Sequence, residues 1–459
     1  MFRKLCIANR GEVAVRIAQA ARQAGAQTMC VVSSTDEGAP WTEEFDETVC
    51  IGGPAPGSSY LRLEAVVQAA RQTGCSAVHP GWGFLAENAR FAALCEQHGL
   101  TFVGPRPSIM ERMGLKWPAK VAMREAGLDL TPGSEGLLET AEEAVAVAGT
   151  TGYPVILKAD AGGGGRGMRI CHSDDEVRTE FPSARAEAIG AFGNGAMFLE
   201  KYVTGGRHIE FQIIGDTYGS AVHLYERECS IQRNHQKLIE ESPSPALSDS
   251  ERQELGARAA GAAASLGYSG AGTIEFLMHP EGEGATAGKL CFMEMNTRLQ
   301  VEHPVTEMVT GIDIVREQLR VAAAGPLGFT QDGVRMEGHA IECRINAEDP
   351  SDNFKPSPGT ATVFDIPSTA GPGRVRIDTH MTNGAEVSPY YDSLVAKVIV
   401  HAADRAQAIA TMQNTLQAAR IEGIKTTIPL HLAVLASPEF QSGQYDTRSI
   451  PGWTQTGTA

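Results

Sequence analysis

The first hundred residues alternate between short apolar strand signals and amphipathic helix signals, and this alternation constrains the fold more than any other feature. The strand signals cover residues 4–8, 28–33, 77–78 and 101–103, and the helix signals cover residues 12–24, 61–72 and 87–97. Such a succession predicts an α/β unit, doubly wound around a parallel sheet. Its first turn, Asn9-Arg10-Gly11-Glu12, lacks the GxGxxG spacing, which disfavours a nicotinamide-dependent enzyme.

Length, charge and cysteine usage narrow the class of protein. A chain of 459 residues with 42% apolar content can bury a large core and is expected to form two to four domains. It has no uninterrupted apolar run of about 18 residues and no signal-peptide pattern, so we expect no membrane partner. The formal net charge of -16 argues against nucleic acid as a partner. Nine scattered cysteines without a CxxC pair indicate reduced thiols in a cytoplasmic enzyme.

The segment from 294 to 303 concentrates chargeable side chains between apolar flanks. Alternation places Glu294, Asn296 and Arg298 on one face of an extended segment. Carboxylate and amide oxygens are ligands that Mg²⁺ accepts beside phosphates, and an arginine offers a planar fork for a small oxyanion. Glu275, alone on an apolar strand signal, is expected to clamp the same metal as Glu294. The alternative is a solvated edge strand, which is expected to have polar flanks, whereas the flanks here are apolar.

A run of four glycines, 162–165, lies between strand signals at 153–158 and 168–171. It predicts a hairpin tip whose bare backbone N–H groups can approach phosphates. Lys158 before it and Arg166 within it favour a phosphate grip over a flexible linker, although the GK[ST] of a P-loop is missing.

The charged stretches at 207–210 and 226–237 are, taken alone, interpreted as a solvated charged loop, followed by a proline-containing turn at 242–245 and a helix over 251–266. Beyond residue 330 a third block mixes strand signals at 360–364, 375–378 and 394–401 with a helix signal at 405–419. The tail from residue 442 is rich in Gly, Ser and Thr and is expected to fray.

Several long motifs in order resemble the biotin carboxylase family of ATP-grasp enzymes, and the resemblance runs from about residue 7 to residue 426. The motifs are HPGWGFL at 79–85, the glycine run, RHIE at 207–210, HQK at 235–237, EMNTRLQVEHPVTE at 294–307 and ECRINAEDP at 342–350. The resemblance implies an α/β ATP-grasp fold: an N-terminal doubly wound α/β domain at 1–114, an ATP-grasp domain at 115–330 with a mobile glycine-rich lid at 132–203, an α+β C-terminal domain at 331–447, and a tail at 448–459.

The resemblance also implies the cofactors, ATP and Mg²⁺, with Mn²⁺ as a possible substitute. The residues that it assigns to ATP are Lys116, Lys158, Gly163, Gly164, Gly165, Gly167, Glu200, Lys201, Val203, His208, Gln232 and His235. Those that it assigns to the metal are Glu275, Glu294 and Asn296.

In the reaction that the resemblance implies, bicarbonate is held by Lys237, Arg298, Gln300, the backbone of Val301, and Glu302. Glu302 takes the bicarbonate proton, attack on the γ-phosphate gives carboxyphosphate, and this breaks to CO₂ and phosphate. Phosphate then takes the ureido proton of biotin, Arg344 stabilises the enolate-like oxygen, and carboxybiotin forms. The catalytic residues are thus Glu302, Arg344, Lys237 and Arg298, with Trp82 beside biotin.

This chain departs from the family pattern at three places. Trp82 stands where the family usually has tyrosine, so an aromatic ring remains while a phenolic hydroxyl is lost. Leu115 precedes Lys116 where an aspartate is usual, and leucine cannot cap the helix that starts there. Asn234 replaces a second arginine, which removes one positive charge beside the bicarbonate region.

No lysine lies between two methionines, so we expect the biotin to be carried by a separate biotin carboxyl carrier protein, with carboxyltransferase subunits as further partners. A homodimer is expected by analogy with the family. The acceptor stays open between acetyl-CoA, as in acetyl-CoA carboxylase of fatty acid biosynthesis, another acyl-CoA and a keto acid. Two other functions compete: an ATP-grasp ligase joining a carboxylate to an amine, and a catalytically silent nucleotide-binding regulator.

Overall fold

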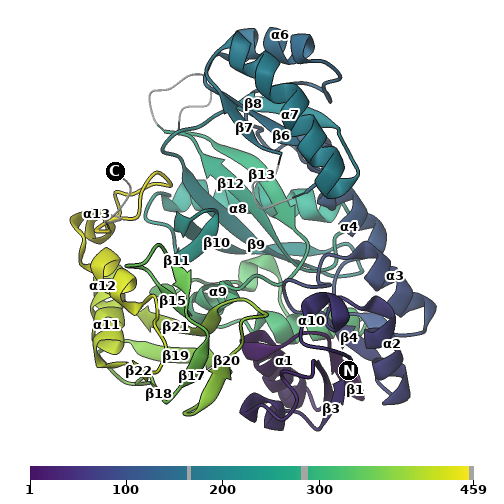
Figure 1. The fold of residues 1–459 in the computed structure, drawn as a ribbon, viewed down its shortest axis with the longest axis vertical. Coiled ribbons are helices and arrows are strands. Elements are labelled where there is room, and N and C mark those ends of the chain that lie inside the picture. Colours follow the sequence, from purple (N-terminus) through teal and green to yellow (C-terminus); the bar gives the residue numbers. More distant parts are fainter. Residues whose placement is uncertain (163–166, 281–287, 454–459) are drawn as a thin grey trace.

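The computed structural model describes residues 1–162, 167–280 and 288–453, and its N-terminal part is a parallel sheet between helices (Figure 1). The strands of this sheet that are described run in the order β3-β2-β1-β4-β5, so the chain winds outward from β1 in both directions. The doubly wound α/β prediction is confirmed. The strands are β1 (Lys4–Ile7), β2 (Gln27–Val32), β3 (Glu47–Cys50), β4 (Ala77–His79) and β5 (Thr101–Phe102), and the helices are α1 (Gly11–Gln23), α2 (Leu63–Gln72), α3 (Ala89–Gln97) and α4 (Pro107–Gly114).

The segment predicted as a lid is a small unit at the top of Figure 1. Its described strands form an antiparallel sheet in the order β7-β6-β8, flanked by two helices. The elements are α6 (Ala141–Thr151), β6 (Val155–Ala159), β7 (Arg169–Cys171), α7 (Asp174–Phe192) and β8 (Met197–Lys201). Strands β6 and β7 pair antiparallel, as the predicted hairpin requires. Its glycine tip, including Gly163, Gly164 and Gly165, lies outside the described residues.

An antiparallel sheet runs through the centre of the molecule in the order β13-β12-β9-β10-β11-β14-β21-β19 among the described strands. Because β11 pairs with β14, the sheet continues across the predicted domain boundary at residue 330, and that boundary stays a prediction. Its strands are β9 (Arg207–Gly215), β10 (Ala221–Arg233), β11 (Gln236–Ser242), β12 (Gly270–Met278), β13 (Leu290–Asn296), β14 (His339–Asn346), β19 (Arg374–Thr379) and β21 (Leu394–Ala402), and the helices beside it are α5 (Lys116–Glu125), α8 (Asp249–Ser265), α9 (His303–Thr310) and α10 (Ile314–Ala322).

The expectation of a solvated charged loop at 207–210 and 226–237 is wrong. Apart from an exposed turn at Asn234 and His235, these residues lie in β9, β10 and β11, in the middle of the sheet, and most of their charged side chains are buried. The charges are tolerated because they pair with one another. Arg227 Nε donates to Glu210 at 2.6 Å, and Arg207 pairs with Glu228 at 3.0 Å. A charged stretch is therefore compatible with a buried strand when each charge meets its opposite on a neighbouring strand.

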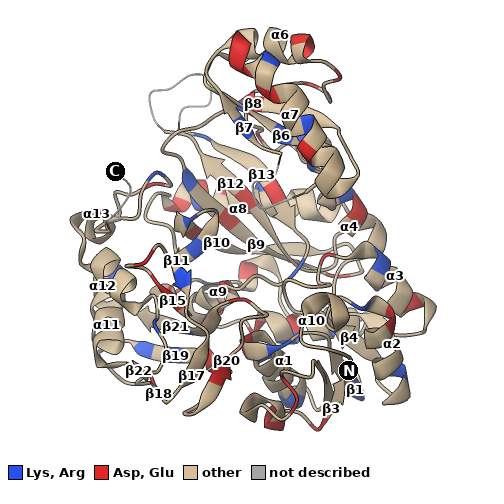
Figure 2. Ribbon diagram, in the orientation of Figure 1, with Lys and Arg blue, Asp and Glu red and all other residues tan. Residues whose placement is uncertain are grey.

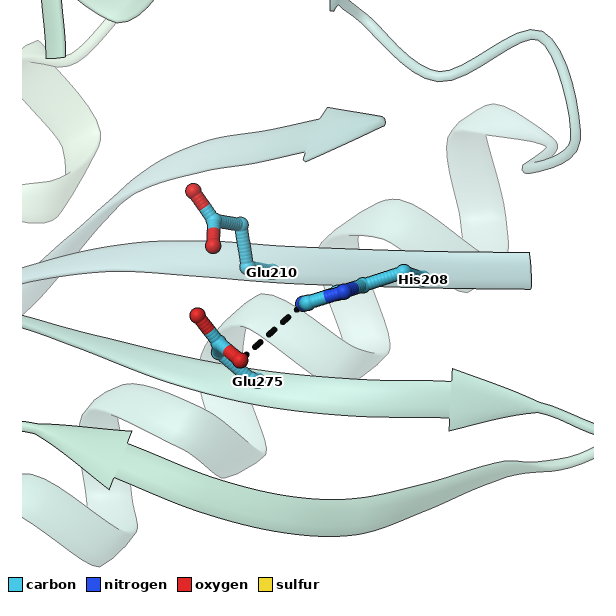
Figure 3. Close-up of side chains that lie close together, drawn as sticks. All are labelled: His208, Glu210 and Glu275. Atoms are coloured by element: carbon cyan, nitrogen blue, oxygen red, sulfur yellow. Dashed lines mark ion pairs between the residues drawn. The ribbon is translucent and has the colours of Figure 1, made fainter. Parts of the chain in front are cut away.

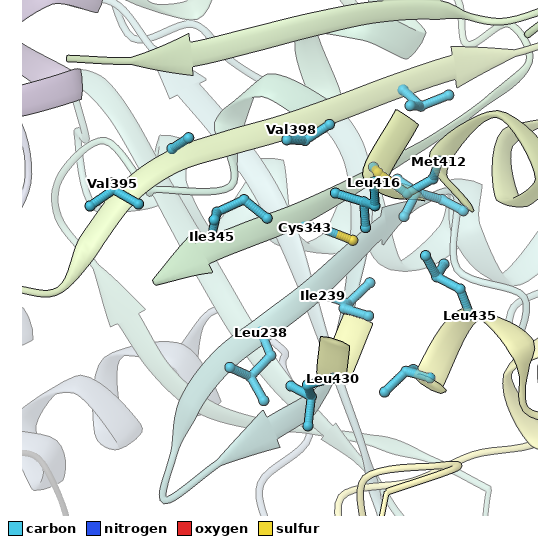
Figure 4. Close-up of a cluster of buried hydrophobic side chains, with 14 of the residues drawn as sticks. Leu238, Ile239, Cys343, Ile345, Val395, Val398, Met412, Leu416, Leu430 and Leu435 are labelled. Atoms are coloured by element: carbon cyan, nitrogen blue, oxygen red, sulfur yellow. The ribbon is translucent and has the colours of Figure 1, made fainter. Parts of the chain in front are cut away.

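The C-terminal part completes the sheet and covers it with helices, at the lower left of Figure 1. Apolar side chains of β11, β14 and β21 pack against α11 and α12, and Figure 4 shows Leu238, Cys343 and Val398 among them. The remaining elements are β15 (Glu348–Asp349), β16 (Lys355–Pro356), β17 (Gly359–Ala361), β18 (Val363–Asp365), β20 (Ala385–Val387), α11 (Arg405–Ala418), β22 (Arg420–Glu422), α12 (Ile428–Ala436), α13 (Pro438–Ser442) and 3-10 turns at Pro40–Glu44, Pro56–Ser58 and Gln331–Gly333.

All nine cysteines are free thiols, and eight of them are buried, as predicted for reduced cysteines. Among the helices of the described ranges, none combines the length and the apolar character that crossing a bilayer requires.

Candidate functional site

A cavity of about 760 Å³ opens between the lid unit, the central sheet and the loop after β4. It brings together side chains from segments far apart in the sequence, such as Trp82, Lys158 and Arg344. Every predicted site residue that the structure describes lines it, except Gly167: Trp82, Lys116, Lys158, Glu200, Lys201, Val203, His208, Gln232, His235, Lys237, Glu275, Glu294, Asn296, Arg298, Gln300, Val301, Glu302 and Arg344. Gly167 lies against β6, where an added Cβ would come within 3.0 Å of the Ala159 side chain.

Lys237, near the start of β11, contacts three of the buried acids at the cavity. Its Nζ donates to Glu210 at 2.5 Å, to Glu302 at 2.6 Å and to Glu275 at 3.0 Å. Burial alone would lower the pKa of Lys237, but the three carboxylates outweigh it and raise the pKa well above its ordinary value. The ammonium therefore stays charged and ties together acids from three separate strands and loops.

Glu302 is fully buried at the start of α9 and lies between two cations. One carboxylate oxygen accepts from Lys237, and the other accepts from Arg344 Nη2 at 2.8 Å. Burial raises the pKa of Glu302, but Lys237, Arg344 and Arg227 outweigh it and hold the pKa well below its ordinary value. Without an anionic guest in the cavity, Glu302 is consequently ionised and a weak base.

The acids predicted to hold a metal meet on two neighbouring strands. Glu275 and Glu294 are direct cross-strand partners in the β12–β13 register, and Asn296 Nδ2 donates to Glu275 at 2.8 Å. Within the described part of the chain, the Glu294 carboxylate has neither a hydrogen bond nor an ion pair. Burial and the nearby Glu275 raise its pKa above the ordinary value. Two facing carboxylates, one of them without a partner, are the donor set that suits a divalent cation.

His208 adds an imidazole to the same place. Its Nε2 lies 3.1 Å from Glu275, and Figure 3 shows this pair with Glu210 beside it. Ligand atoms of His208, Glu210 and Glu275 all lie within 4.8 Å of one another. Glu210 accepts from Arg227 and Lys237, and Glu275 accepts from Lys237 and Asn296, so among the described acids of this group Glu294 is the one with both oxygens to spare for a metal.

At the lid end of the cavity, lysines surround a single acid. Glu200 on β8 accepts from Lys158 at 2.6 Å and forms an ion pair with Lys120. Burial raises the pKa of Glu200, but Lys158 and Lys120 outweigh it and lower the pKa to about 2. Lys120 is a cavity residue that the sequence prediction missed, although it lies one helical turn after Lys116 on α5 and therefore on the same face. Together with Lys116, these ammonium groups can neutralise phosphate charge.

The helix that carries Lys116 has a cap despite Leu115. The Leu115 side chain makes no capping hydrogen bond, as expected. Instead the backbone N–H of Trp117 donates to Asp160 Oδ1 at 2.7 Å, and that of Lys116 donates to the Asp160 carbonyl at 3.0 Å. Asp160 follows β6, so a residue of the lid supplies the cap from a distance and positions the first turn of α5.

Arg298 forms an ion pair with Glu87, a residue of the N-terminal part. Strand β13 ends at Asn296, so Arg298 lies in the following loop and not on the strand face that was predicted. Its Nε donates to Glu87 at 2.8 Å, and its other nitrogens donate to Asn296 and Gln300, both at 3.1 Å. Glu87 was not predicted as a site residue; it also accepts from the backbone N–H of Thr297 at 3.0 Å.

Comparison with known proteins agrees over the whole chain. Family models match the biotin carboxylase N-terminal domain over residues 1–110, the ATP-binding domain of the carbamoyl-phosphate synthase L chain over 116–330, and the biotin carboxylase C-terminal domain over 342–451. The chain is 50% identical to a biotin carboxylase of Nostoc sp., over 98% of each chain. It is 46% identical to the small subunit of 2-oxoglutarate carboxylase from Hydrogenobacter thermophilus, over 98% of this chain and 93% of that one.

A solved structure shares the fold as well. The biotin carboxylase domain of Hydrogenobacter thermophilus 2-oxoglutarate carboxylase matches with a TM-score of 0.92 and 46% sequence identity, over 98% of this chain and 97% of that one. That structure is a dimer in complex with MgADP, ADP and bicarbonate.

Proposed function

The chain belongs to the biotin carboxylase family, and from that premise we propose how its cavity divides the work of the reaction. It is an ATP-dependent biotin carboxylase, which consumes ATP and bicarbonate and gives ADP, phosphate and carboxybiotin. The observation that carries the assignment of roles is the position of Lys237, which contacts an acid of the metal pair, Glu275, and the proposed base, Glu302, with the same ammonium group.

ATP would occupy the lid end of the cavity. Lys116, Lys120 and Lys158 would neutralise its phosphates, and Glu200, Lys201 and Val203 would lie beside the adenine. His208, Gln232 and His235 would surround the rest of the nucleotide, and the glycine segment with Gly163, Gly164, Gly165 and Gly167 would cover it. Mg²⁺, or Mn²⁺, held by Glu275, Glu294 and Asn296 would neutralise charge on the terminal phosphates.

Bicarbonate would bind beside Lys237, Arg298, Gln300, Val301 and Glu302. Its negative charge would compete with Glu302 for Lys237. Because Lys237 is one of the cations that lower the pKa of Glu302, this competition would raise that pKa and make Glu302 a stronger base. Glu302 then takes the bicarbonate proton as the oxyanion attacks the γ-phosphate, so the proton transfer is coupled to phosphoryl transfer. The product, carboxyphosphate, breaks to CO₂ and phosphate, and a closed lid would protect it from water.

Arg344 would stabilise the enolate-like oxygen of biotin while phosphate removes the ureido proton and the nitrogen captures CO₂. Arg344 already reaches Glu302 at 2.8 Å, so the biotin and bicarbonate ends of the cavity adjoin. Trp82 would provide the aromatic wall beside the biotin ring.

The biotin would be presented by a separate biotin carboxyl carrier protein, and carboxyltransferase subunits would use the product in the cytoplasm. We propose a homodimer, in line with the dimer of the Hydrogenobacter relative. For the acceptor we propose acetyl-CoA, another acyl-CoA or a keto acid. Relatives of similar identity carry the names of pyruvate and 2-oxoglutarate carboxylase subunits, which supports a keto acid beside the acyl-CoA candidates.

The test is ADP release by the purified chain with Mg-ATP, with and without bicarbonate and free biotin. We expect turnover that needs bicarbonate and rises with biotin. The variant Glu302→Gln is expected to bind nucleotide normally and to lose at least about 100-fold of the bicarbonate-dependent rate, the scale of a general base. An unchanged rate would remove Glu302 from the proton-taking role, and turnover that ignores biotin would favour another ATP-grasp ligase.

A further inference from the structure

Lys397, on β21, is a buried cation to which the reaction described above gives no role. Its side chain is 0% exposed and lies where three parts of the chain meet. Nζ is 3.0 Å from Glu12 Oε2 in the first turn of α1 and 3.7 Å from Asp378 Oδ2 on β19. It also donates to the backbone carbonyl of Val301, at 3.0 Å. A single ammonium group thus joins the N-terminal part, the C-terminal part and the loop before α9.

The carbonyl that Lys397 holds belongs to the loop expected to cradle bicarbonate. The carbonyl one residue earlier, that of Gln300, accepts from His303 Nδ1 at 2.8 Å. In a trans peptide the N–H points opposite to the C=O. Fixing these two carbonyls therefore fixes the N–H groups of Val301 and Glu302, and neither N–H has an acceptor within the described residues. Both residues line the cavity.

Glu12, the partner of Lys397, also contacts a second residue of the cavity lining. It is 2% exposed at the side chain, and its second oxygen, Oε1, accepts from Trp82 Nε1 at 3.1 Å. Trp82 lines the cavity and is the residue proposed to contact biotin. A phenylalanine at this position could not make this hydrogen bond, because only the indole carries an N–H. Contacts therefore run without a break from Trp82 through Glu12 and Lys397 to Val301.

We propose that Glu12 and Lys397 are positioning residues that set the geometry of both substrate-binding walls: Lys397 orients the bicarbonate loop through the Val301 carbonyl, and Glu12 orients the indole of Trp82. The inference rests on the proposed placing of bicarbonate and biotin in the cavity. Stability alone does not explain why Glu12 and Lys397 are charged, since an apolar pair of equal volume is often as stable as a buried ion pair. A positioning role does explain it.

A matched pair of substitutions separates positioning from stability. Lys397→Met alone would leave Glu12 buried and unpaired, which is strongly destabilising. The double variant Lys397→Met/Glu12→Gln removes both charges and keeps similar volumes, so we expect it to fold. Lys355→Met, at an exposed lysine of the same part of the chain, is the control. Thermal unfolding of each variant is measured beside steady-state ADP release.

For the double variant we expect KM for bicarbonate to rise about tenfold, and KM for ATP to change by less than about twofold, because the lid end is not in contact with Lys397. A rise in KM for bicarbonate of less than about threefold in the folded double variant would overturn the inference. Failure of the wild-type chain to release ADP in response to bicarbonate would instead contradict the proposed function, so the two failures are distinguishable.

The other wall is tested without touching a buried charge. Trp82→Phe keeps an aromatic ring and removes the indole N–H, and with it the hydrogen bond to Glu12, together with the smaller ring of the indole. We expect KM for free biotin to rise about fivefold, which corresponds in free energy to the loss of one hydrogen bond that positions the ring. KM for ATP should stay unchanged. A KM for biotin within about twofold of wild type would overturn the role of Glu12 in placing the indole, and this result is informative even if the double variant does not fold.

Discussion

At the scale of single residues, the site works through mutual neutralisation of buried charges. Glu240 and Glu342 extend the cluster behind Arg344: they are cross-strand partners on β11 and β14, both fully buried. Glu240 accepts from Arg344 Nε at 2.6 Å, whereas no hydrogen bond to either Glu342 oxygen is present in the described part of the chain. Burial raises the pKa of Glu240 to about 7 and that of Glu342 well above its ordinary value, against the opposing effect of Arg344 and Lys397.

This arrangement predicts how stability depends on pH. Because the pKa of Glu342 is higher in the folded chain than in the unfolded chain, the folded state binds the extra proton, and its stability falls as pH rises above about 4.5. Glu342→Gln removes this titration. We expect the thermal midpoint of Glu342→Gln minus that of wild type to increase as pH rises from about 5 to about 8. Below about pH 4 the two midpoints should depend on pH in almost the same way.

Thermal unfolding of both proteins across this range is the measurement. Glu241 offers a contrast, because His339 and Arg405 outweigh its burial and lower its pKa to about 2. For Glu241→Gln the sign is opposite: wild type should lose its advantage as pH falls from about 4.5 towards about 2. A Glu342→Gln variant whose pH profile runs parallel to that of wild type would show that Glu342 is ionised in the fold.

At the scale of elements, the sequence predicted the apolar strands and the capped helices but not the charged strands. Strand β12, an apolar run with one acid, was predicted, and it is buried almost throughout. Strands β9 and β10 were not, because their charges become acceptable only through partners such as Arg227 and Glu210, which are far apart in sequence. Helix α7 has no counterpart among the predicted elements, although Ser173 caps it and its first turn is acidic.

The candidate site follows the same rule. Residues inside long motifs, such as Lys237 and Glu302, could be predicted together with their chemistry. Glu87, Lys120 and Lys397 could not, because each matters only through a contact between distant segments: with Arg298, with Glu200, and with Glu12. Pattern and motif identify the groups that meet the substrates, while the residues that position those groups appear only when the chain is folded.

The cap of α5 gives a prediction at this scale. Asp160→Ala removes the acceptor for the N–H of Trp117, which costs about 1 kcal/mol in a typical helix cap and would loosen Lys116. We expect KM for ATP to rise about fivefold, the equivalent of that energy, while KM for bicarbonate stays near wild type. Asp160→Asn keeps a side-chain oxygen in place and is the control. Equal KM values for ATP in all three proteins would contradict the role of the cap.

At the scale of the whole molecule, one antiparallel sheet brings the parts of the cavity together. The sheet carries Glu294 on β13, Glu275 on β12, Lys237 on β11 and Arg344 on β14, so the proposed metal acids and two of the cations proposed to meet bicarbonate and biotin stand on one sheet. Figure 2 shows charged residues along the central strands as well as on the outer helices. A chain with a net charge of -16 can nevertheless hold anions, because lysines and arginines outnumber acids among the residues that line the cavity.

The central claim is that bicarbonate is phosphorylated in this cavity before its carbon reaches biotin. The most direct measurement supplies bicarbonate labelled with oxygen-18, together with Mg-ATP and biotin, and follows the label by mass spectrometry of the released phosphate. Because carboxyphosphate leaves one bicarbonate oxygen on phosphorus when it breaks, we predict one labelled oxygen in each phosphate formed by the bicarbonate-dependent reaction. Unlabelled phosphate, released at the same rate as ADP while biotin is carboxylated, would contradict the account.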